Sequence, residues 1–161
     1  MQLKKALEIA EKTVDLLKPD CERIEIAGSI RRRKAEPNDI EIVAIPKPYD
    51  IGLFESGIAI TVNQWTPVKG ILPCKYTQRL LPEGIKLDLF FATPDNWGMI
   101  YAIRTGSARF SHEVLACRWA RFGYKSKEGI LYREGKPYHI REEEDLFALL
   151  GMEFVPPERR I

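Results

Sequence analysis

The stretch from Ala27 to Val43 constrains this chain more than any other. It opens with a Gly28-Ser29 turn, runs through four consecutive basic residues, and ends in a strand-like run where Asp39 and Glu41 alternate with isoleucines. Side chains two apart on a strand point to the same face, so both carboxylates share one face while the isoleucines enter the core. A glycine turn, clustered positive charge and paired carboxylates together favour a site for phosphate groups and divalent metal ions.

Composition narrows the class of protein. A chain of 161 residues with 45% hydrophobic content is most simply one domain, or two small subdomains that share a core. No apolar run approaches the roughly 20 residues of a membrane span, and the N-terminus leads into an amphipathic pattern. The three cysteines are odd in number and widely spaced, which argues against disulfides and against a CxxC zinc site. We therefore expect an intracellular, cytoplasmic protein with no membrane partner.

Positive charge is concentrated in one segment, although the net charge is only +2. From Arg104 to Arg141 the chain carries nine Lys or Arg against three Glu, with aromatic residues between them. Such a segment suits a nucleic-acid backbone, because phosphates supply most of the affinity. The alternative is an ordinary solvated helix face. The residues that we expect to contact DNA are Arg104, Arg109, Arg118, Lys125 and Lys127.

In the first third of the chain, the spacing of apolar residues predicts the secondary structure. Apolar residues spaced by three and four predict an amphipathic helix over 2–18, ended by Pro19. A short strand follows at Ile24 and Ile26, and strand character resumes at 40–43 after the Gly28-Ser29 turn.

Residues 44–78 are punctuated by prolines and glycines and are harder to interpret. We predict a helical piece near 51–55 and edge strands around 58–62 and 76–81. A tight turn at 82–84 then precedes a strand over 85–91, on which Asp88 shares its face with Lys86 and Phe90.

After Thr93 the character becomes helical. We expect helices over 94–104, 108–122 and 142–150, a hairpin over 130–140, and an extended tail at 154–157. The predicted fold class is α+β: a mixed or antiparallel sheet flanked by helices in residues 1–93, then a small helical subdomain with a hairpin in 94–161. A ligand site is expected in the cleft between two such parts.

The carboxylates have a specific chemical use. Asp39, Glu41 and Asp88 supply oxygen ligands for a pair of Mg²⁺ or Mn²⁺ ions, which can clamp the attacking and leaving oxygens of a phosphoryl displacement. Backbone N–H groups at Gly28-Ser29 can approach phosphate oxygens, and Arg31 or Arg32 can neutralise the charge of a departing pyrophosphate. Acids that alternate on a strand are also common on a solvated face, so the pair alone would be weak evidence.

These motifs together resemble the X family of DNA polymerases, the DNA polymerase beta group, over essentially the whole chain. The family pattern is Gly-Ser-x-Arg-Arg, then Asp-x-Asp, then a third Asp on a later strand, then a Thr-Gly-Ser turn between helices. The corresponding segments here are Gly28–Arg32, Asp39-Ile40-Glu41, Asp88 within Lys86–Leu89, Thr105-Gly106-Ser107 before Phe110, and a similar tail through Pro156–Arg159.

The resemblance implies a DNA polymerase with a nucleotidyltransferase palm over 1–93, followed by a nucleotide- and DNA-binding subdomain over 94–161. Asp39, Glu41 and Asp88 would be catalytic and hold two Mg²⁺ or Mn²⁺ ions. The implied substrates are a dNTP and gapped or primer-template DNA, for short-gap filling in repair. We expect a monomer, with room for a repair-protein partner. The implied nucleotide-binding residues are Gly28, Ser29, Arg32, Asn38, Thr105, Gly106, Ser107, Phe110 and Ser111.

Several positions depart from the family pattern. Glu41 replaces an Asp, Asn38 stands where a glycine is usual, and Ile103-Arg104 replaces an aromatic pair that helps exclude ribonucleotides. Ser111 and Leu115 occupy positions where the family often has Asn and Arg near the nascent base pair. We therefore expect weaker discrimination between nucleotides. The pattern starts at residue 1, so we also expect the basic segment, residues 44–78 or a partner to replace the family's lyase and helix-hairpin-helix domains in holding DNA.

Two other functions stay open. The Gly-Ser and Asp-x-Glu elements are shared by nucleotidyltransferases that modify a small molecule, an RNA end or a protein. The substitutions at Glu41 and Asn38 also fit a nucleic-acid-binding module whose catalytic site has decayed.

Overall fold

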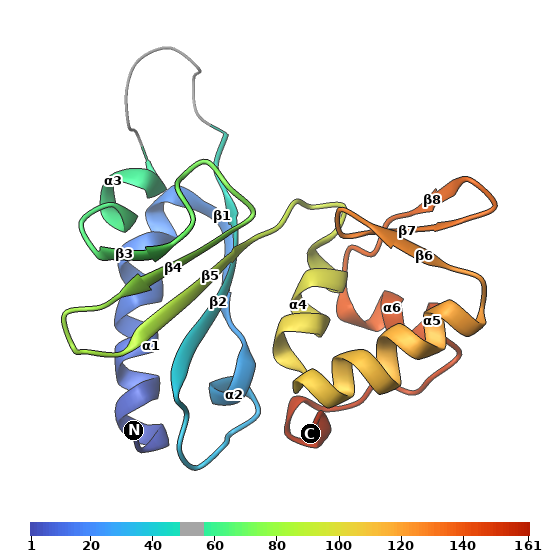
Figure 1. The fold of residues 1–161 in the computed structure, drawn as a ribbon, viewed down its shortest axis with the longest axis horizontal. Helices are drawn as coiled ribbons and strands as arrows, with labels where there is room; N and C mark the ends of the chain where they lie inside the picture. The colour runs from blue at the N-terminus through green and yellow to red at the C-terminus, as the bar shows by residue number, and fades with distance from the viewer. Residues whose placement is uncertain (49–56) are drawn as a thin grey trace. The chain divides into compact units, whose positions relative to one another are not determined.

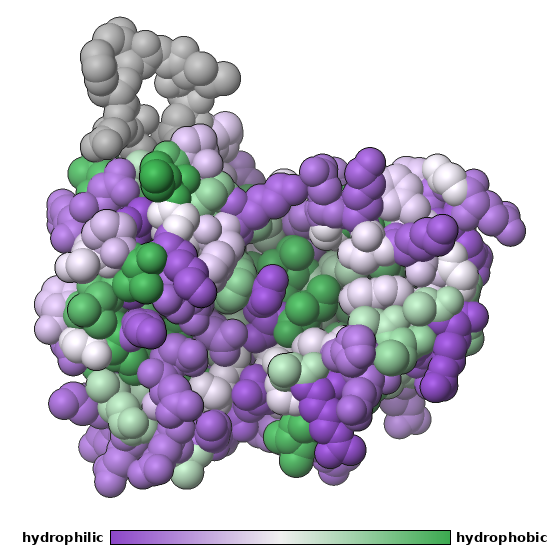
Figure 2. All heavy atoms as spheres, viewed as in Figure 1, coloured by the Kyte–Doolittle hydropathy of each residue, from purple (hydrophilic) through white to green (hydrophobic). Residues whose placement is uncertain are grey.

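The computed structural model describes residues 1–48 and 57–161 and shows an α+β fold with two compact units, Met1–Ala92 and Thr93–Ile161 (Figure 1). Each unit is described by itself. The helical piece predicted near 51–55 lies outside the described residues. Among the described residues, no helix combines the length and the apolar character that crossing a bilayer requires. Hydrophilic residues cover most of the face in Figure 2, and apolar ones form small separate groups on it.

The first unit is built on a five-stranded mixed sheet with the strand order β1-β2-β5-β4-β3. Strands β2 and β5 pair in parallel, and every other pairing in this sheet is antiparallel. The strands are β1 (Cys21–Ile26), β2 (Asp39–Pro46), β3 (Thr66–Lys69), β4 (Tyr76–Leu80) and β5 (Lys86–Phe91), and the helices are α1 (Leu3–Leu17), α2 (Gly28–Arg31) and α3 (Ile58–Val62).

Helix α1 covers one face of this sheet, as predicted from its apolar spacing (Figure 1). Ala6, Ile9 and Ala10 of α1 belong to the same buried cluster as Ile42 of β2 and Leu89 of β5. Because neighbouring residues on a strand point to opposite faces, burying these side chains commits the alternate positions of β2 and β5 to the other face. That second face carries the carboxylates.

Residues 58–62 were wrongly predicted as an edge strand, because they form helix α3. The β-branched residues of this segment favour a strand locally. However, Ile58 and Val62 lie one helical turn apart and both enter the core, whereas Ile60 is 50% exposed. Tertiary packing therefore overrides local propensity here. The strand predicted over 76–81 is present as β4, but it lies between β5 and β3 and is not an edge strand as predicted. The edges of this sheet are β1 and β3, and the sequence did not reveal β3.

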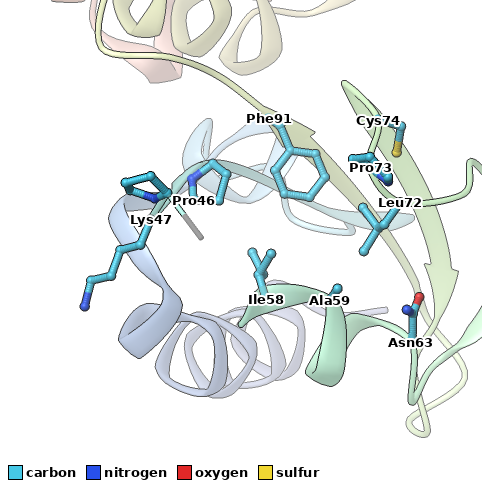
Figure 3. A pocket seen from close by; sticks show the side chains of 10 residues that line it. Pro46, Lys47, Ile58, Ala59, Asn63, Leu72, Pro73, Cys74 and Phe91 are labelled. Carbon is cyan, nitrogen blue, oxygen red and sulfur yellow. The ribbon is translucent and has the colours of Figure 1, made fainter. Parts of the chain in front are cut away.

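An apolar hollow of about 530 Å³ lies beside α3, on the face of the sheet opposite to the carboxylates. Figure 3 shows Ile58, Leu72 and Phe91 pointing into it. Its other lining residues include Pro46 and Pro48, at the end of the first described stretch.

The second unit combines helices with a three-stranded antiparallel sheet of strand order β6-β7-β8, rather than the two-stranded hairpin predicted. The helix predicted over 108–122 is present, but its first part is a π-helix, η2. The N–H of Cys117 bonds the carbonyl of His112, five residues back. The elements are α4 (Trp97–Thr105), η2 (Phe110–Ala116), α5 (Cys117–Arg121), β6 (Lys125–Lys127), β7 (Ile130–Arg133), β8 (Lys136–Tyr138), α6 (Glu143–Leu149) and the 3₁₀ turn η3 (Pro157–Arg159).

A buried ion pair ties the C-terminal tail to the second unit. Arg160 is fully buried, and its Nη1 donates to Oε1 of Glu143 at the start of α6. Its Nε donates to the carbonyl of Val155 at 2.8 Å, and its guanidinium lies 5.1 Å from the ring centres of both Phe147 and Phe154. Burying two charges is costly unless each satisfies the other, so the pair must form or break as a unit.

We predict that Arg160→Met lowers the free energy of unfolding by about 3 to 5 kcal/mol, because it removes the guanidinium that pairs with the buried carboxylate of Glu143. Urea denaturation followed by circular dichroism measures this. The exposed neighbour Arg159, replaced by Met, is the matched control and should change stability by about 0.5 kcal/mol or less. An Arg160→Met, Glu143→Leu double variant should be more stable than Arg160→Met alone; equal stability would contradict the ion-pair explanation.

Candidate functional site

The parallel pairing of β2 with β5 creates the candidate site. Its register sets Glu41 directly beside Asp88 and Asp39 beside Lys86. The intervening Ile40 and Leu87 are fully buried in the core on the opposite face. Three carboxylates from two adjacent strands therefore lie on one face of the sheet, with Lys86 at its end.

The three carboxylates affect one another electrostatically. Burial, together with the charges of Asp39 and Asp88, raises the pKa of Glu41 to about 7. Burial and then the charge of Asp88 also raise the pKa of Asp39. The positive charge of Arg32 opposes both shifts, so this arginine lies within electrostatic reach of the pair. Burial and mutual repulsion therefore outweigh the neutralising groups around Asp39 and Glu41.

The Gly28-Ser29 segment lies against Glu41. Instead of the simple turn that we predicted, these residues begin the short helix α2, with Gly28 at a φ of +60°. A Cβ atom on Gly28 would overlap the carboxylate of Glu41 and lie 2.8 Å from its Cβ. The Ser29 backbone N–H donates a hydrogen bond to Glu41 that opposes the rise in its pKa. Only glycine fits here, and the reason visible in the structure is the approach to Glu41.

The Ser29 hydroxyl is unused within the described part of the chain. Its Oγ is buried and has no hydrogen-bond partner there. A buried hydroxyl normally finds a partner, so one without a partner marks a place where a ligand oxygen could bind.

Asp88 is held by two side chains of β4, Tyr76 and Gln78, which the sequence did not indicate as site residues. It is 8% exposed, and its Oδ1 accepts hydrogen bonds from the Tyr76 hydroxyl at 2.6 Å and from the Gln78 amide at 2.7 Å. Tyr76 and Gln78 alternate along a strand that the sequence did predict, so their shared face could be inferred. Their contact with Asp88 depends on the β4–β5 register, which the sequence pattern did not specify.

Asn38 immediately precedes β2 and is exposed. With Asp39 and Lys86 it lines a recess of about 410 Å³, closed by Met1, Leu80, Gly84 and Ile85. Asp39, at the N-terminal end of β2, therefore borders an open recess, and Glu41 and Asp88 are not among its lining residues.

These residues fit a divalent cation by their chemistry. Within the described stretches, no three His, Cys, Asp or Glu side chains already surround one point as a metal site would require. However, Asp39, Glu41 and Asp88 provide only oxygen donors, the type that Mg²⁺ and Mn²⁺ prefer. A bound cation would also offset the repulsion that raises the pKa values of Asp39 and Glu41.

In the second unit, the predicted nucleotide-binding residues build one tight turn between α4 and η2. Ser107 Oγ accepts from the Phe110 N–H at 3.0 Å, and Ser111 Oγ donates to the Ile103 carbonyl at 2.7 Å. A Cβ on Gly106 would lie only 2.6 Å from Ser111 Oγ, so a side chain at this position would displace the hydroxyl that closes the turn. The side chains of Thr105 and Phe110 are buried, as is Leu115, which is fully enclosed in the core of the unit.

The predicted DNA-contacting residues differ in their surroundings. Arg118 donates from Nε to the Leu150 carbonyl at 2.7 Å and from Nη2 to that of Gly151 at 3.3 Å, which caps the C-terminus of α6. Arg109 forms an exposed ion pair with Glu113 at 3.0 Å. Both lysines of β6, Lys125 and Lys127, are exposed, as is Arg104 at the end of α4.

Residues 101–161 match the family model of the DNA polymerase beta thumb. The C-terminal part of the chain is thus related to a DNA polymerase domain. We call residues 101–161 the thumb-matching segment; it contains the Thr105-Gly106-Ser107 turn, η2 and the three-stranded sheet. No curated protein matches the chain. The match does not reach the carboxylates, whose assignment depends on the geometry of β2 and β5.

We predict that Gly28→Ala destabilises the protein by at least about 1 kcal/mol more than Gly84→Ala. Both glycines have a positive φ, so both substitutions strain the backbone, but a Cβ at Gly84 meets nothing within 4 Å. The difference between the two variants in urea denaturation isolates the overlap with Glu41. Equal destabilisation would show that Glu41 does not approach Gly28 this closely.

We also predict a pH-dependent gain in stability for Glu41→Gln in protein treated with a chelator. A raised pKa in the folded state means that the contribution of Glu41 is complete below its unfolded pKa near 4.5 and is lost as the pH rises through about 7. At pH 8 the variant should therefore be more stable than the wild type by about 1 to 3 kcal/mol, and this advantage should shrink towards pH 4.5. Denaturation curves across this range test the prediction, and a pH-independent difference would contradict it.

Proposed function

We propose that this protein is a metal-dependent DNA polymerase that adds nucleotides to a primer 3′-hydroxyl, with short-gap filling in repair as its task. One observation carries the proposal: three carboxylates share a face of adjacent parallel strands, in a chain whose C-terminal part matches a polymerase thumb. In the reaction, the 3′-hydroxyl would lose its proton to water, its oxygen would bond to the α-phosphorus of a dNTP, the α–β phosphoanhydride bond would break, and pyrophosphate would leave.

The carboxylates would hold the metal ions. Asp39 and Glu41 would bind both Mg²⁺ or Mn²⁺ ions, and Asp88 would bind one of them and orient the primer 3′-hydroxyl. Two such ions would stabilise the charge on the attacking and leaving oxygens. This proposal explains why the chain accepts raised pKa values at Asp39 and Glu41, because that arrangement is unfavourable without a cation.

The triphosphate would lie near the Gly28-Ser29 segment. The unpartnered Ser29 hydroxyl can donate to a phosphate oxygen, and Arg32, whose charge already acts on Asp39 and Glu41, can neutralise the departing pyrophosphate. Gly28 keeps the backbone close to Glu41, and Asn38 borders the recess beside Asp39.

The thumb-matching segment would bind the nucleotide and the DNA. Gly106 and Ser107 would line the sugar through the backbone of their turn. Buried Thr105 and Phe110 would act by shaping that turn, and Ser111 would act by closing it. Arg104, Lys125 and Lys127 are exposed and would contact DNA phosphates. Of the other two predicted DNA-contacting residues, Arg109 pairs with Glu113 and Arg118 caps the end of α6.

Primer extension on gapped DNA, with Mg²⁺ or Mn²⁺, tests the proposal. We expect template-directed incorporation by the wild type and a loss of about 10³-fold in Asp88→Asn, since removing a metal ligand costs several kcal/mol of transition-state stabilisation. Asp15→Asn, an exposed carboxylate on α1, is the matched control and should retain full activity.

No incorporation with either metal would contradict the proposal. Transfer only to a small molecule, an RNA end or a protein would assign the chain to a different nucleotidyltransferase activity. Salt-sensitive DNA binding without any transfer would instead identify a non-catalytic module.

A further inference from the structure

Asp88 differs from the other two carboxylates in how it is held. Both of its side-chain hydrogen bonds come from strand β4, and both reach the same oxygen, Oδ1. In the described part of the chain, no hydrogen bond to its Oδ2 is found. One oxygen of Asp88 is therefore fixed to the protein, and the other is left to the carboxylate face.

The β4–β5 register explains why two donors meet on one oxygen. Gln78 lies directly across from Asp88, so its amide reaches the carboxylate over the shortest cross-strand distance. Tyr76 lies across from Phe90, two residues further along β5. Its ring stacks on Phe90 with centres 4.9 Å apart, and from there its hydroxyl extends diagonally to Asp88.

Two donors on one oxygen fix the rotation of a carboxylate. Hydrogen bonds to a charged acceptor are among the stronger ones in proteins, and at 2.6 and 2.7 Å both are short. Replacing the outer-shell partners that orient a metal ligand typically weakens metal binding by about 10- to 100-fold. The apolar stack of Tyr76 on Phe90 limits the movement of the donor itself.

We infer that Tyr76 and Gln78 are positioning residues. By holding Oδ1, they make Asp88 a monodentate ligand that presents Oδ2 to a divalent cation. This inference rests on the proposed function, because it takes the carboxylate face as the metal site. Neither residue touches the reacting atoms; each acts through Asp88. Glu41, by contrast, is positioned by a backbone N–H, that of Ser29.

Mn²⁺ binding to the whole protein, without DNA or nucleotide, tests this inference by electron paramagnetic resonance. Tyr76→Phe removes the hydroxyl and keeps the ring on Phe90, while Gln78→Met removes the amide at similar length. We expect the double variant to bind Mn²⁺ about tenfold more weakly than the wild type, with a smaller loss in each single variant. Tyr132→Phe and Gln64→Met are the matched controls and should bind as the wild type does.

Primer extension supplies the second measurement. The double variant should lose kcat with little change in the KM for the dNTP, because the residues that would hold the triphosphate are intact. Lower thermal stability with unchanged Mn²⁺ affinity and unchanged kcat would overturn the inference and reduce Tyr76 and Gln78 to a structural role.

The two proposals fail in different ways. If the wild type binds Mn²⁺ and Asp88→Asn weakens binding while the Tyr76 and Gln78 variants do not, the inference is overturned and the metal site stands. If the wild type binds no Mn²⁺ at all, the metal site is overturned and the inference with it.

Discussion

The parallel pairing of β2 with β5 is the constraint on which the rest of the first unit depends. Its register brings Asp39, Glu41 and Asp88 onto one face and places Ile42 and Leu89 in the core on the other. A slip of one residue would exchange the two faces of a strand, burying its carboxylates and exposing its apolar side chains. The apolar core that α1 and the sheet form therefore also specifies the alignment of the candidate site, and the same packing that stabilises the unit holds three like charges together.

That arrangement has an energetic cost, which falls on Asp39 and Glu41. Burial and mutual repulsion disfavour the charged forms of Asp39 and Glu41, as the direction of both pKa shifts shows. Arg32 offsets it for both carboxylates, together with the Ser29 backbone N–H for Glu41 and with a backbone hydrogen bond and Lys34 for Asp39. A protein under selection for stability alone would have no use for such a cluster, and strongly perturbed carboxylates are more frequent at functional sites. The cost is thus an argument for function that does not depend on the family match, which covers only residues 101–161.

Strong periodicity allowed much of this fold to be predicted from the sequence. Helix α1, the strand positions of β2 and β5, and the face on which Asp88 lies all follow from apolar spacing, because the core selects the buried positions. The errors arise where contacts with distant parts of the chain determine the local conformation. Residues 58–62 have strand-forming side chains but become α3 when Ile58 and Val62 pack on the core. The local sequence does not predict that η2 is a π-helix or that Arg160 pairs with Glu143, 17 residues away.

The candidate site shows the same limit more sharply. The residue types at Gly28, Asp39, Glu41 and Asp88 are visible in the sequence, but their reasons for being there are partly different from those that the sequence implies. From the sequence, we expected Gly28 to let the backbone approach a phosphate. The structure shows that its missing side chain leaves room for the carboxylate of Glu41. Since Glu41 is one methylene longer than the aspartate that the motif leads one to expect, a glycine beside it removes the atom that would obstruct the longer side chain. The longer side chain at position 41 and the glycine at position 28 are therefore best understood together, as one adaptation that keeps a third carboxylate on this face.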